Sequence, residues 1–211
     1  MMINFDYLFP KYGIKPDGVI HLGANTGQEA ETYKKHGIDN VIWVEAIPSV
    51  YEELLTHLEA VGCGHHRCIN ACVGDEDGKI VEFKISNNEA QSSSYLELGH
   101  HKVIHPTVKY VSTLEMQMQR CDTLFKDVDF SGNWFLNADL QGSELQAFKG
   151  MGDLMSKFKW VYSEVNFKEC YIGGALIGEI DQYLSKFGFT RVETGVIVGE
   201  TWTDALYITS S

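Results

Sequence analysis

The feature that constrains the fold most is an alternation of short apolar runs with amphipathic segments between residues 18 and 74. The segments alternate as strand 18–23, helix 28–37, strand 40–46, helix 48–62 and strand 67–74. The first helical segment ends at Gly37, and the second begins at Pro48, as is typical of helix ends and starts. This β-α-β-α-β order predicts parallel strands that pair in one sheet with helices packed against it.

The rest of the chain continues the alternation with less regular spacing. We expect an edge strand at 79–86, a strand that turns helical over 108–125, strands at 133–142 and 159–166, helices at 143–158 and 175–188, and strands at 189–198 and 203–210. The helix over 143–158 is expected to break near Gly150. The last two strands are close in sequence, so they are expected to pair antiparallel.

The length of 211 residues favours a single domain over 1–211. Residues 1–17 are expected to be an N-terminal extension with a turn or a short helix. Residues 86–107 are polar and rich in histidine, and they follow no steady period. A long irregular stretch in an α/β domain is usually functional, so we expect a lid over the substrate.

The stretch VIHLGANTGQEA, residues 19–30, places a glycine turn between a strand and a helix. Gly23 and Gly27 permit a tight turn and a close approach of backbone to ligand. Glu45 ends the next strand, where a carboxylate accepts hydrogen bonds from ribose hydroxyls in dinucleotide folds. NAD would require a third glycine, and the chain has Glu29 there. S-adenosylmethionine has no pyrophosphate and fits a looser turn better.

Ligands of open α/β sheets bind outside the carboxyl ends of the strands. His21, Glu45, Asp139 and Glu164 are all expected at or near those ends. Asp139 and Glu164 belong to strands that are otherwise apolar, where an acid is costly unless it is paired or functional. These side chains are therefore candidates for the site.

Several motifs together resemble the FkbM family of S-adenosylmethionine-dependent methyltransferases. They are VIHLGANTG, VIWVEAIP, SSSYLELGHH, NWFLNADLQGSELQAFKG, WVYSEVN and DALYIT, and they extend over about residues 18–209. The most specific is DLQGSELQAFKG, which is close to the family's Asp-x-Gln-Gly-x-Glu pattern followed by a glycine. The resemblance implies a class I Rossmann-like α/β fold. Its sheet would be seven-stranded and mostly parallel, with an antiparallel C-terminal hairpin and helices on both faces.

The resemblance also implies methyl transfer, usually to a hydroxyl oxygen and often on sugars or polyketides. His21 stands where the family commonly has an acid, so His21 or Asn25 is expected to contact the methionine portion of the cofactor. The cofactor, S-adenosylmethionine with S-adenosylhomocysteine as its product, is expected to contact His21, Gly23, Ala24, Asn25, Gly27, Glu45, Ala46, Cys72 and Gln141.

The chemistry requires alignment of the acceptor and removal of its proton. Asp139 is the first candidate for the base, because in such a fold its strand lies beside the strand of the glycine turn. His101 is the second candidate, and Glu164 is a further catalytic candidate. The alternative is a metal-assisted route in which Asp139, Glu164 and a loop histidine hold Mg²⁺. We expect that no metal is required.

The acceptor is expected to be a hydroxyl of a sugar, a glycan or a similar small polar molecule. Its expected contacts are Ser94, Tyr95, His105 and Tyr171. Two alternatives remain at this point. They are an NAD-dependent oxidoreductase on a Rossmann fold and a nucleoside-binding domain without catalytic activity.

Charge and cysteine usage bear on the partners and the compartment. The formal net charge is −12 and no dense run of lysine and arginine occurs, so nucleic acid is not an expected partner. No apolar stretch is long enough for a membrane span. The N-terminus has no signal-peptide pattern, and the five cysteines form no CxxC pair, so we expect reduced thiols in a cytoplasmic protein. The cluster CGHHRC, residues 63–68, is too crowded for a typical zinc site.

Overall fold

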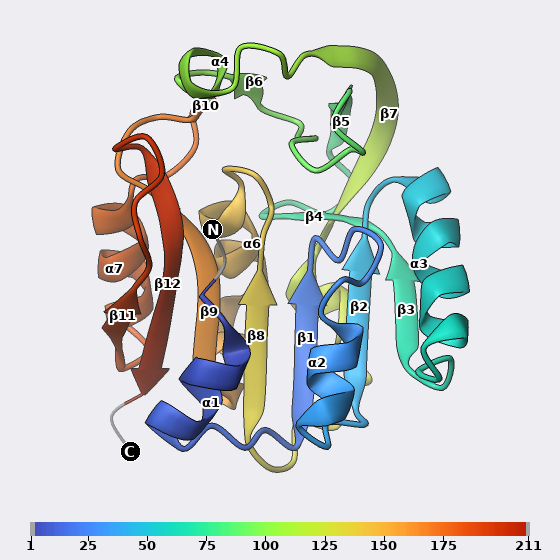
Figure 1. The fold of residues 1–211 in the computed structure, drawn as a ribbon, viewed down its shortest axis with the longest axis vertical. Coiled ribbons are helices and arrows are strands. Elements are labelled where there is room, and N and C mark those ends of the chain that lie inside the picture. The colour runs from blue at the N-terminus through green and yellow to red at the C-terminus, as the bar shows by residue number, and fades with distance from the viewer. Residues whose placement is uncertain (1–2, 210–211) are drawn as a thin grey trace.

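Seven strands form the central sheet, which orders the whole molecule (Figure 1). They are β1 (Gly18–Leu22), β2 (Val41–Glu45), β3 (Arg67–Asn70), β8 (Trp134–Ala138), β9 (Phe158–Asn166), β11 (Phe189–Thr194) and β12 (Trp202–Thr209). This computed structural model describes residues 3–209, and the order across its sheet is β11-β12-β9-β8-β1-β2-β3. β12 is antiparallel to both of its neighbours, and the pairs from β9 to β3 are parallel. The predicted sheet with its C-terminal hairpin is confirmed.

Helices cover both faces of this sheet, as expected. One face carries α1 (Phe5–Tyr12), α2 (Ala30–Lys35) and α3 (Pro48–Ala60), and the other carries α5 (Cys121–Leu124), α6 (Glu144–Met151), the 3₁₀ segment η1 (Gly152–Lys157) and α7 (Ile177–Ser185). Figure 1 shows α1 and α2 in front of the sheet. Successive side chains of a strand point to opposite faces. Accordingly, Phe135 packs in the core under α1–α3 and Leu136 in the core under α5–α7.

The segment 67–74, which we expected to be one strand, is two strands in different sheets. β3 ends at Asn70, whose Nδ2 donates to the backbone oxygens of Glu45 and Ala46 at 2.8 and 2.9 Å. These hydrogen bonds tie the chain to the end of β2, where the pairing of β2 with β3 also ends. The next strand, β4 (Cys72–Gly74), leaves the central sheet and joins β7 (Tyr110–Arg120) and β5 (Ile80–Ser86) in a second sheet of order β4-β7-β5.

A cap of strands and loops lies over the carboxyl ends of β1, β2 and β8 (Figure 1). It contains β5, most of β7, the short strand β6 (Glu97–Leu98) and the one-turn helix α4 (His101–Ile104). β6 pairs with β10 (Tyr171–Ile172), which follows β9. The predicted lid segment, 86–107, thus contains two short regular elements and is anchored to the central domain at its middle.

The ends of several helices differ from the expected bounds. α2 begins at Ala30 rather than at residue 28, because the turns after β1, with Gly27 at φ +78°, continue through residue 29. The expected helix over 143–158 changes from α6 to η1 at Gly152, near the predicted break. Within residues 3–209, no helix combines the length and apolar character needed to cross a membrane.

Candidate active site

The site begins where β1 and β8 lie side by side and their connections leave in opposite directions along the sheet. Such a switch point opens a crevice at the carboxyl ends of the strands. Asp139 N donates to Leu22 O at 3.0 Å, which holds the two strand ends together. Gly23 has φ +76°, and a Cβ atom there would lie 1.8 Å from the backbone oxygen of Asp139. Only glycine fits at this position.

The crevice widens into a cavity of about 470 Å³, within the usual size of small-molecule sites. Its floor is formed by the ends of β1, β2, β8, β9 and β12. Its roof is formed by residues of the cap, between Asn88 and Val108. Hydrogen bonds from side chains to backbone oxygens join roof to floor. Asn25 Nδ2 donates to Glu89 O at 3.3 Å, and Ser94 Oγ donates to Gln141 O at 3.0 Å.

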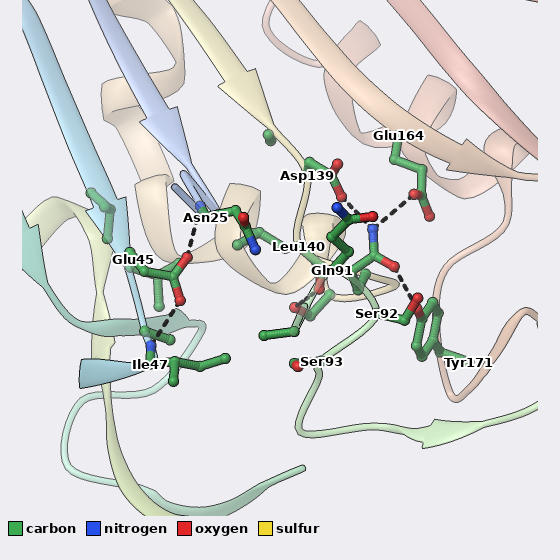
Figure 2. Close-up of a pocket in the computed structure, with 18 of the residues that line it drawn as sticks. Asn25, Glu45, Ile47, Gln91, Ser92, Ser93, Asp139, Leu140, Glu164 and Tyr171 are labelled. Atoms are coloured by element: carbon green, nitrogen blue, oxygen red, sulfur yellow. Dashed lines mark hydrogen bonds between the residues drawn. The ribbon is translucent and has the colours of Figure 1, made fainter. Parts of the chain in front are cut away.

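Glu45 forms one side of the cavity and is fixed through both carboxylate oxygens (Figure 2). Oε2 accepts a hydrogen bond from Asn25 N at 2.9 Å, and Oε1 accepts one from Ile47 N at 2.8 Å. Each oxygen keeps a second lone pair for a ligand hydroxyl. Beside it, Ala46, Cys72 and other residues at the ends of β2 and β4 provide a mainly apolar wall. The arrangement suits a ribose with an attached base.

Asp139, Glu164 and Tyr171 form the opposite side (Figure 2). The side-chain amide of Gln141 joins them through hydrogen bonds. Gln141 Nε2 donates to Asp139 Oδ1 and, at 3.1 Å, to Glu164 Oε2. The hydroxyl of Tyr171 donates to Gln141 Oε1. Glu164 is only 5% exposed, whereas Asp139 is exposed and lines the cavity. Asp139 is thus the more accessible acid of this group, although both line the cavity.

The sequence DLQGSE explains how Gln141 reaches this position. Glu144 is buried, and its Oε1 accepts hydrogen bonds from Leu140 N at 2.7 Å and Gly142 N at 3.2 Å, which closes a tight turn after β8. Gln141 has φ +52° and Gly142 has φ +95°. A Cβ atom at Gly142 would lie 2.7 Å from the side chain of Tyr171, so the motif's glycine is required for packing as well as for conformation.

Five carboxyl groups line the cavity, and no lysine or arginine of residues 3–209 lines it with them. Burial, followed by the charge of Asp139, raises the pKa of both Glu29 and Asp204 to about 7. Burial, followed by the charge of Asp139, raises the pKa of Glu164 well above its ordinary value. The pKa of Asp139 itself is raised by desolvation and lowered in part by the hydrogen bonds from Gln141. Burial also raises the pKa of Glu45.

His21 is held in a buried network beneath the glycine turn. Its ring stacks on Trp43 with centroids 5.0 Å apart, and its Nδ1 lies 3.2 Å from the hydroxyl of Tyr33. Burial lowers the pKa of His21 to about 3, so the imidazole is neutral at neutral pH. The 3.9 Å separation from Glu29 Oε2 is therefore not an ion pair. His21 contributes shape and a polar edge to the floor of the cavity.

The roof contains the two histidines singled out from the sequence. His101 is 6% exposed, its Nε2 lies 3.2 Å from Ser92 Oγ, and its ring centroid is 4.9 Å from that of His105. Burial, followed by the charge of His105, lowers the pKa of His101 to about 4. Both rings line the cavity, as does Tyr95.

Most of the residues predicted for the site come together in this one cavity. Those that line it are His21, Gly23, Asn25, Glu45, Ala46, Cys72, Tyr95, His101, His105, Asp139, Gln141, Glu164 and Tyr171. Three others do not. Ser94 is turned to the Gln141 carbonyl, Ala24 is 1% exposed within the core, and a Cβ atom at Gly27 would point at Leu54, 2.7 Å away.

Several residues of the wall are not predicted from the sequence. Glu29 precedes α2, where the sequence shows only that the third glycine of an NAD-binding turn is missing. Asp204 is an acid within a largely apolar strand. The same pattern identified Asp139 and Glu164, and it could have identified Asp204 as well. The polar roof residues Asn88 and Gln91 carry no pattern that distinguishes them from an ordinary loop.

The raised pKa of Glu29 predicts a pH-dependent stability. The folded protein holds a proton on Glu29 up to about pH 7, whereas in the unfolded chain the pKa of Glu29 has its ordinary value of 4.5. The free energy of unfolding therefore falls as the pH rises from 4.5 to 7. The loss is complete by pH 8 and is on the order of 3 kcal/mol. The melting temperature of Glu29→Gln should therefore be higher than that of wild type at pH 8. Near pH 4.5 the two melting temperatures should be equal. Thermal melts without ligand measure this, with exposed Glu31→Gln on the same helix as the control. A Glu29→Gln profile parallel to wild type would contradict the assignment.

Comparison with known proteins places this geometry in a family. A model of the methyltransferase FkbM domain matches residues 21–191. No curated protein matches the sequence. Among solved structures, the chain is similar to the magnesium protoporphyrin IX methyltransferase of Synechocystis with bound S-adenosylmethionine, at 12% identity, 97% and 76% coverage of the two chains and a TM-score of 0.54. It is also similar to the precorrin-6y C5,15-methyltransferase of Geobacter metallireducens, at 9% identity, 97% and 87% coverage and a TM-score of 0.54.

These solved structures share the fold, and the family match extends from His21 at the end of β1 to Arg191 in the C-terminal hairpin. The expected cofactor is therefore confirmed as S-adenosylmethionine, and the alternative of an NAD-dependent oxidoreductase is set aside. The chain belongs to the FkbM methyltransferase family and is an S-adenosylmethionine-dependent methyltransferase.

Proposed function

We propose that the enzyme methylates a hydroxyl oxygen of a sugar, a glycan or a similar small polar acceptor, with Asp139 as the base. The observation that carries this proposal is the position of Asp139, an exposed residue that lines the floor of a cavity whose roof is polar. The five cysteines are free thiols, which supports a reducing, cytoplasmic location for this activity.

The roof supports an acceptor rich in hydroxyls. Three of its buried polar atoms, Asn88 Oδ1, Tyr95 Oη and His101 Nδ1, have no hydrogen-bond partner within residues 3–209. All three residues line the cavity. Buried polar groups normally have partners, so atoms left without one in a cavity are candidates to bind a ligand. Ser92 and Ser93 add hydroxyls to the same surface.

The floor supports S-adenosylmethionine at the other end of the cavity. The close approach at Gly23 brings backbone near the ligand, Glu45 offers two fixed oxygens for the ribose, and Cys72 and Val73 belong to the apolar wall for the base. When bound, this cofactor supplies a methyl group activated by its sulfonium. The remaining tasks belong to the chain, which must orient the acceptor oxygen and take its proton.

Asp139 is better suited than its neighbours to accept that proton. It is exposed in the cavity, its raised pKa makes it a stronger base than an ordinary aspartate, and Gln141 fixes its orientation. Glu164 is buried behind the same amide, so we assign it to orienting Gln141. His101 has a pKa lowered to about 4, which makes it a weak base at neutral pH.

Product analysis tests the proposed function. The purified enzyme with S-adenosylmethionine should transfer a methyl group to oxygen on members of a panel of glycosides, and mass spectrometry with NMR identifies the methylated atom. The control is the Asp139→Asn variant on the same panel. Methylation confined to nitrogen, carbon or sulfur atoms would contradict the proposal.

We expect turnover to survive removal of metal ions. Among residues 3–209, no three His, Cys, Asp or Glu side chains come together as a group that could hold a metal. Activity in the presence of EDTA should therefore equal activity without it, measured as S-adenosylhomocysteine formed. If EDTA abolishes turnover and Mg²⁺ restores it, the metal-assisted route is correct, and Asp139 is a ligand rather than the base.

A further inference from the structure

Three of the carboxyl groups stand in a row across adjacent strands. Ala138 of β8 is opposite Ser163 of β9, so the next residues along these parallel strands, Asp139 and Glu164, are level. Glu164 is in turn opposite Asp204 of β12. Neighbouring strands are about 4.8 Å apart, so the row extends about 10 Å from the methyl-accepting end of the cavity.

Asp204 is the member of this row that the proposed chemistry leaves unexplained. It is 6% exposed and lines the cavity, and its Oδ2 has no hydrogen-bond partner within residues 3–209. Its partner in the pairing, Glu164, is also buried and acidic. Two buried acids side by side are costly, and no lysine or arginine of the described chain reaches the cavity to neutralise them.

The charge of the cofactor would balance only one of these acids in its ionised form. S-adenosylmethionine has a sulfonium and an ammonium against one carboxylate, which leaves a net charge of about +1 at neutral pH. Apart from Glu45, four acids face the cavity, namely Glu29, Asp139, Glu164 and Asp204. An anionic acceptor such as a phosphorylated sugar would be repelled here, whereas a cationic one would be attracted.

We propose that the acceptor carries an amine as well as the methylated hydroxyl, and that its ammonium group binds between Asp204 and Glu164. This inference rests on the proposed function, because it takes Asp139 as the position of the hydroxyl. Two aromatic residues of the same strands, Tyr162 of β9 and Trp202 of β12, also line the cavity, and aromatic faces attract cations. The acceptor class is therefore an amino sugar or a comparable amino alcohol.

An extended organic cation fits the row better than a metal ion does. A divalent cation draws its oxygen ligands to within about 2.0–2.6 Å of one point. The acids of this row stand on three successive strands, and no three potential ligands converge within residues 3–209. An amine and a hydroxyl separated by several bonds of a sugar ring can instead contact different members of the row.

Binding to the protein loaded with S-adenosylhomocysteine tests the inference without turnover. The probes are methyl glucosides with one hydroxyl replaced by an amine at position 2, 3, 4 or 6, each paired with its neutral N-acetyl derivative. Isothermal titration should show that at least one amine binds tenfold or more tightly than its N-acetyl partner. Asp204→Asn should weaken binding of that amine by tenfold or more and leave S-adenosylhomocysteine affinity unchanged. The control is Glu200→Gln, which removes an exposed acid of the same hairpin outside the cavity.

The outcomes separate this inference from the proposed function. If no amine binds more tightly than its N-acetyl partner, the inference is wrong even when a neutral sugar is O-methylated. If Mg²⁺ rather than any amine raises the melting temperature in a manner that depends on Asp204, the row is a metal site and the inference is also wrong. If an amine binds through Asp204 but no oxygen of it is methylated, the ammonium site stands and the proposed function fails. Methylation of the bound nitrogen itself would contradict both.

Discussion

Asp139→Asn is expected to lower kcat by about 10² to 10⁴, the usual contribution of a general base. Asparagine cannot take the proton from the acceptor hydroxyl, yet its oxygen can still accept the hydrogen bond from Gln141 that positions Asp139 in the wild type. Titration with S-adenosylmethionine and thermal melts should consequently show affinity and stability close to those of wild type. Steady-state kinetics on a responsive acceptor measures the change.

A matched control for this variant is Asp127→Asn, which removes an exposed acid in the connection that leads into the opposite end of β8. It should leave kcat within twofold of the wild-type value. The reverse pattern at position 139, a large loss of stability with nearly normal kcat in the folded fraction, would make Asp139 a structural residue. His101 would then be the next candidate, because its ring lines the same cavity from the roof.

Glu45→Ala is expected to weaken binding of S-adenosylmethionine by about 1 to 3 kcal/mol, or about fivefold to 150-fold in Kd. The carboxylate holds Asn25 N and Ile47 N while its free lone pairs face the cavity, so its removal loses ligand contacts and loosens the turn. Glu45→Gln retains one oxygen and should lose less affinity than the alanine variant. Calorimetric titration of both variants measures the loss.

The demethylated product distinguishes the two contributions of Glu45. S-adenosylhomocysteine has the same ribose and lacks the sulfonium charge, so a contact to the ribose predicts equal losses for cofactor and product. A loss confined to S-adenosylmethionine would mean that Glu45 acts through charge rather than through the hydroxyls. Unchanged affinity for both ligands would remove Glu45 from the site.

The sequence determined the order of the elements, because local periodicity reports which side of a segment is buried. The strand that ends in Glu45, the strand that leads into Asp139 and the strand that contains Glu164 were predicted in this way, and so was the antiparallel C-terminal hairpin. The glycine turn was also readable, since Gly23 is required by a backbone conformation that few other residues adopt.

Only the tertiary structure decided how residues far apart in the chain combine. The split of segment 67–74 depends on where β2 ends, and the orientation of Ser94 depends on the carbonyl of Gln141. The row of Asp139, Glu164 and Asp204 depends on the register between three strands. Register is fixed by packing between segments, which a local pattern does not contain. For this reason the sequence indicated a cofactor and a base, whereas the charge that the acceptor meets became visible only when the strands were paired.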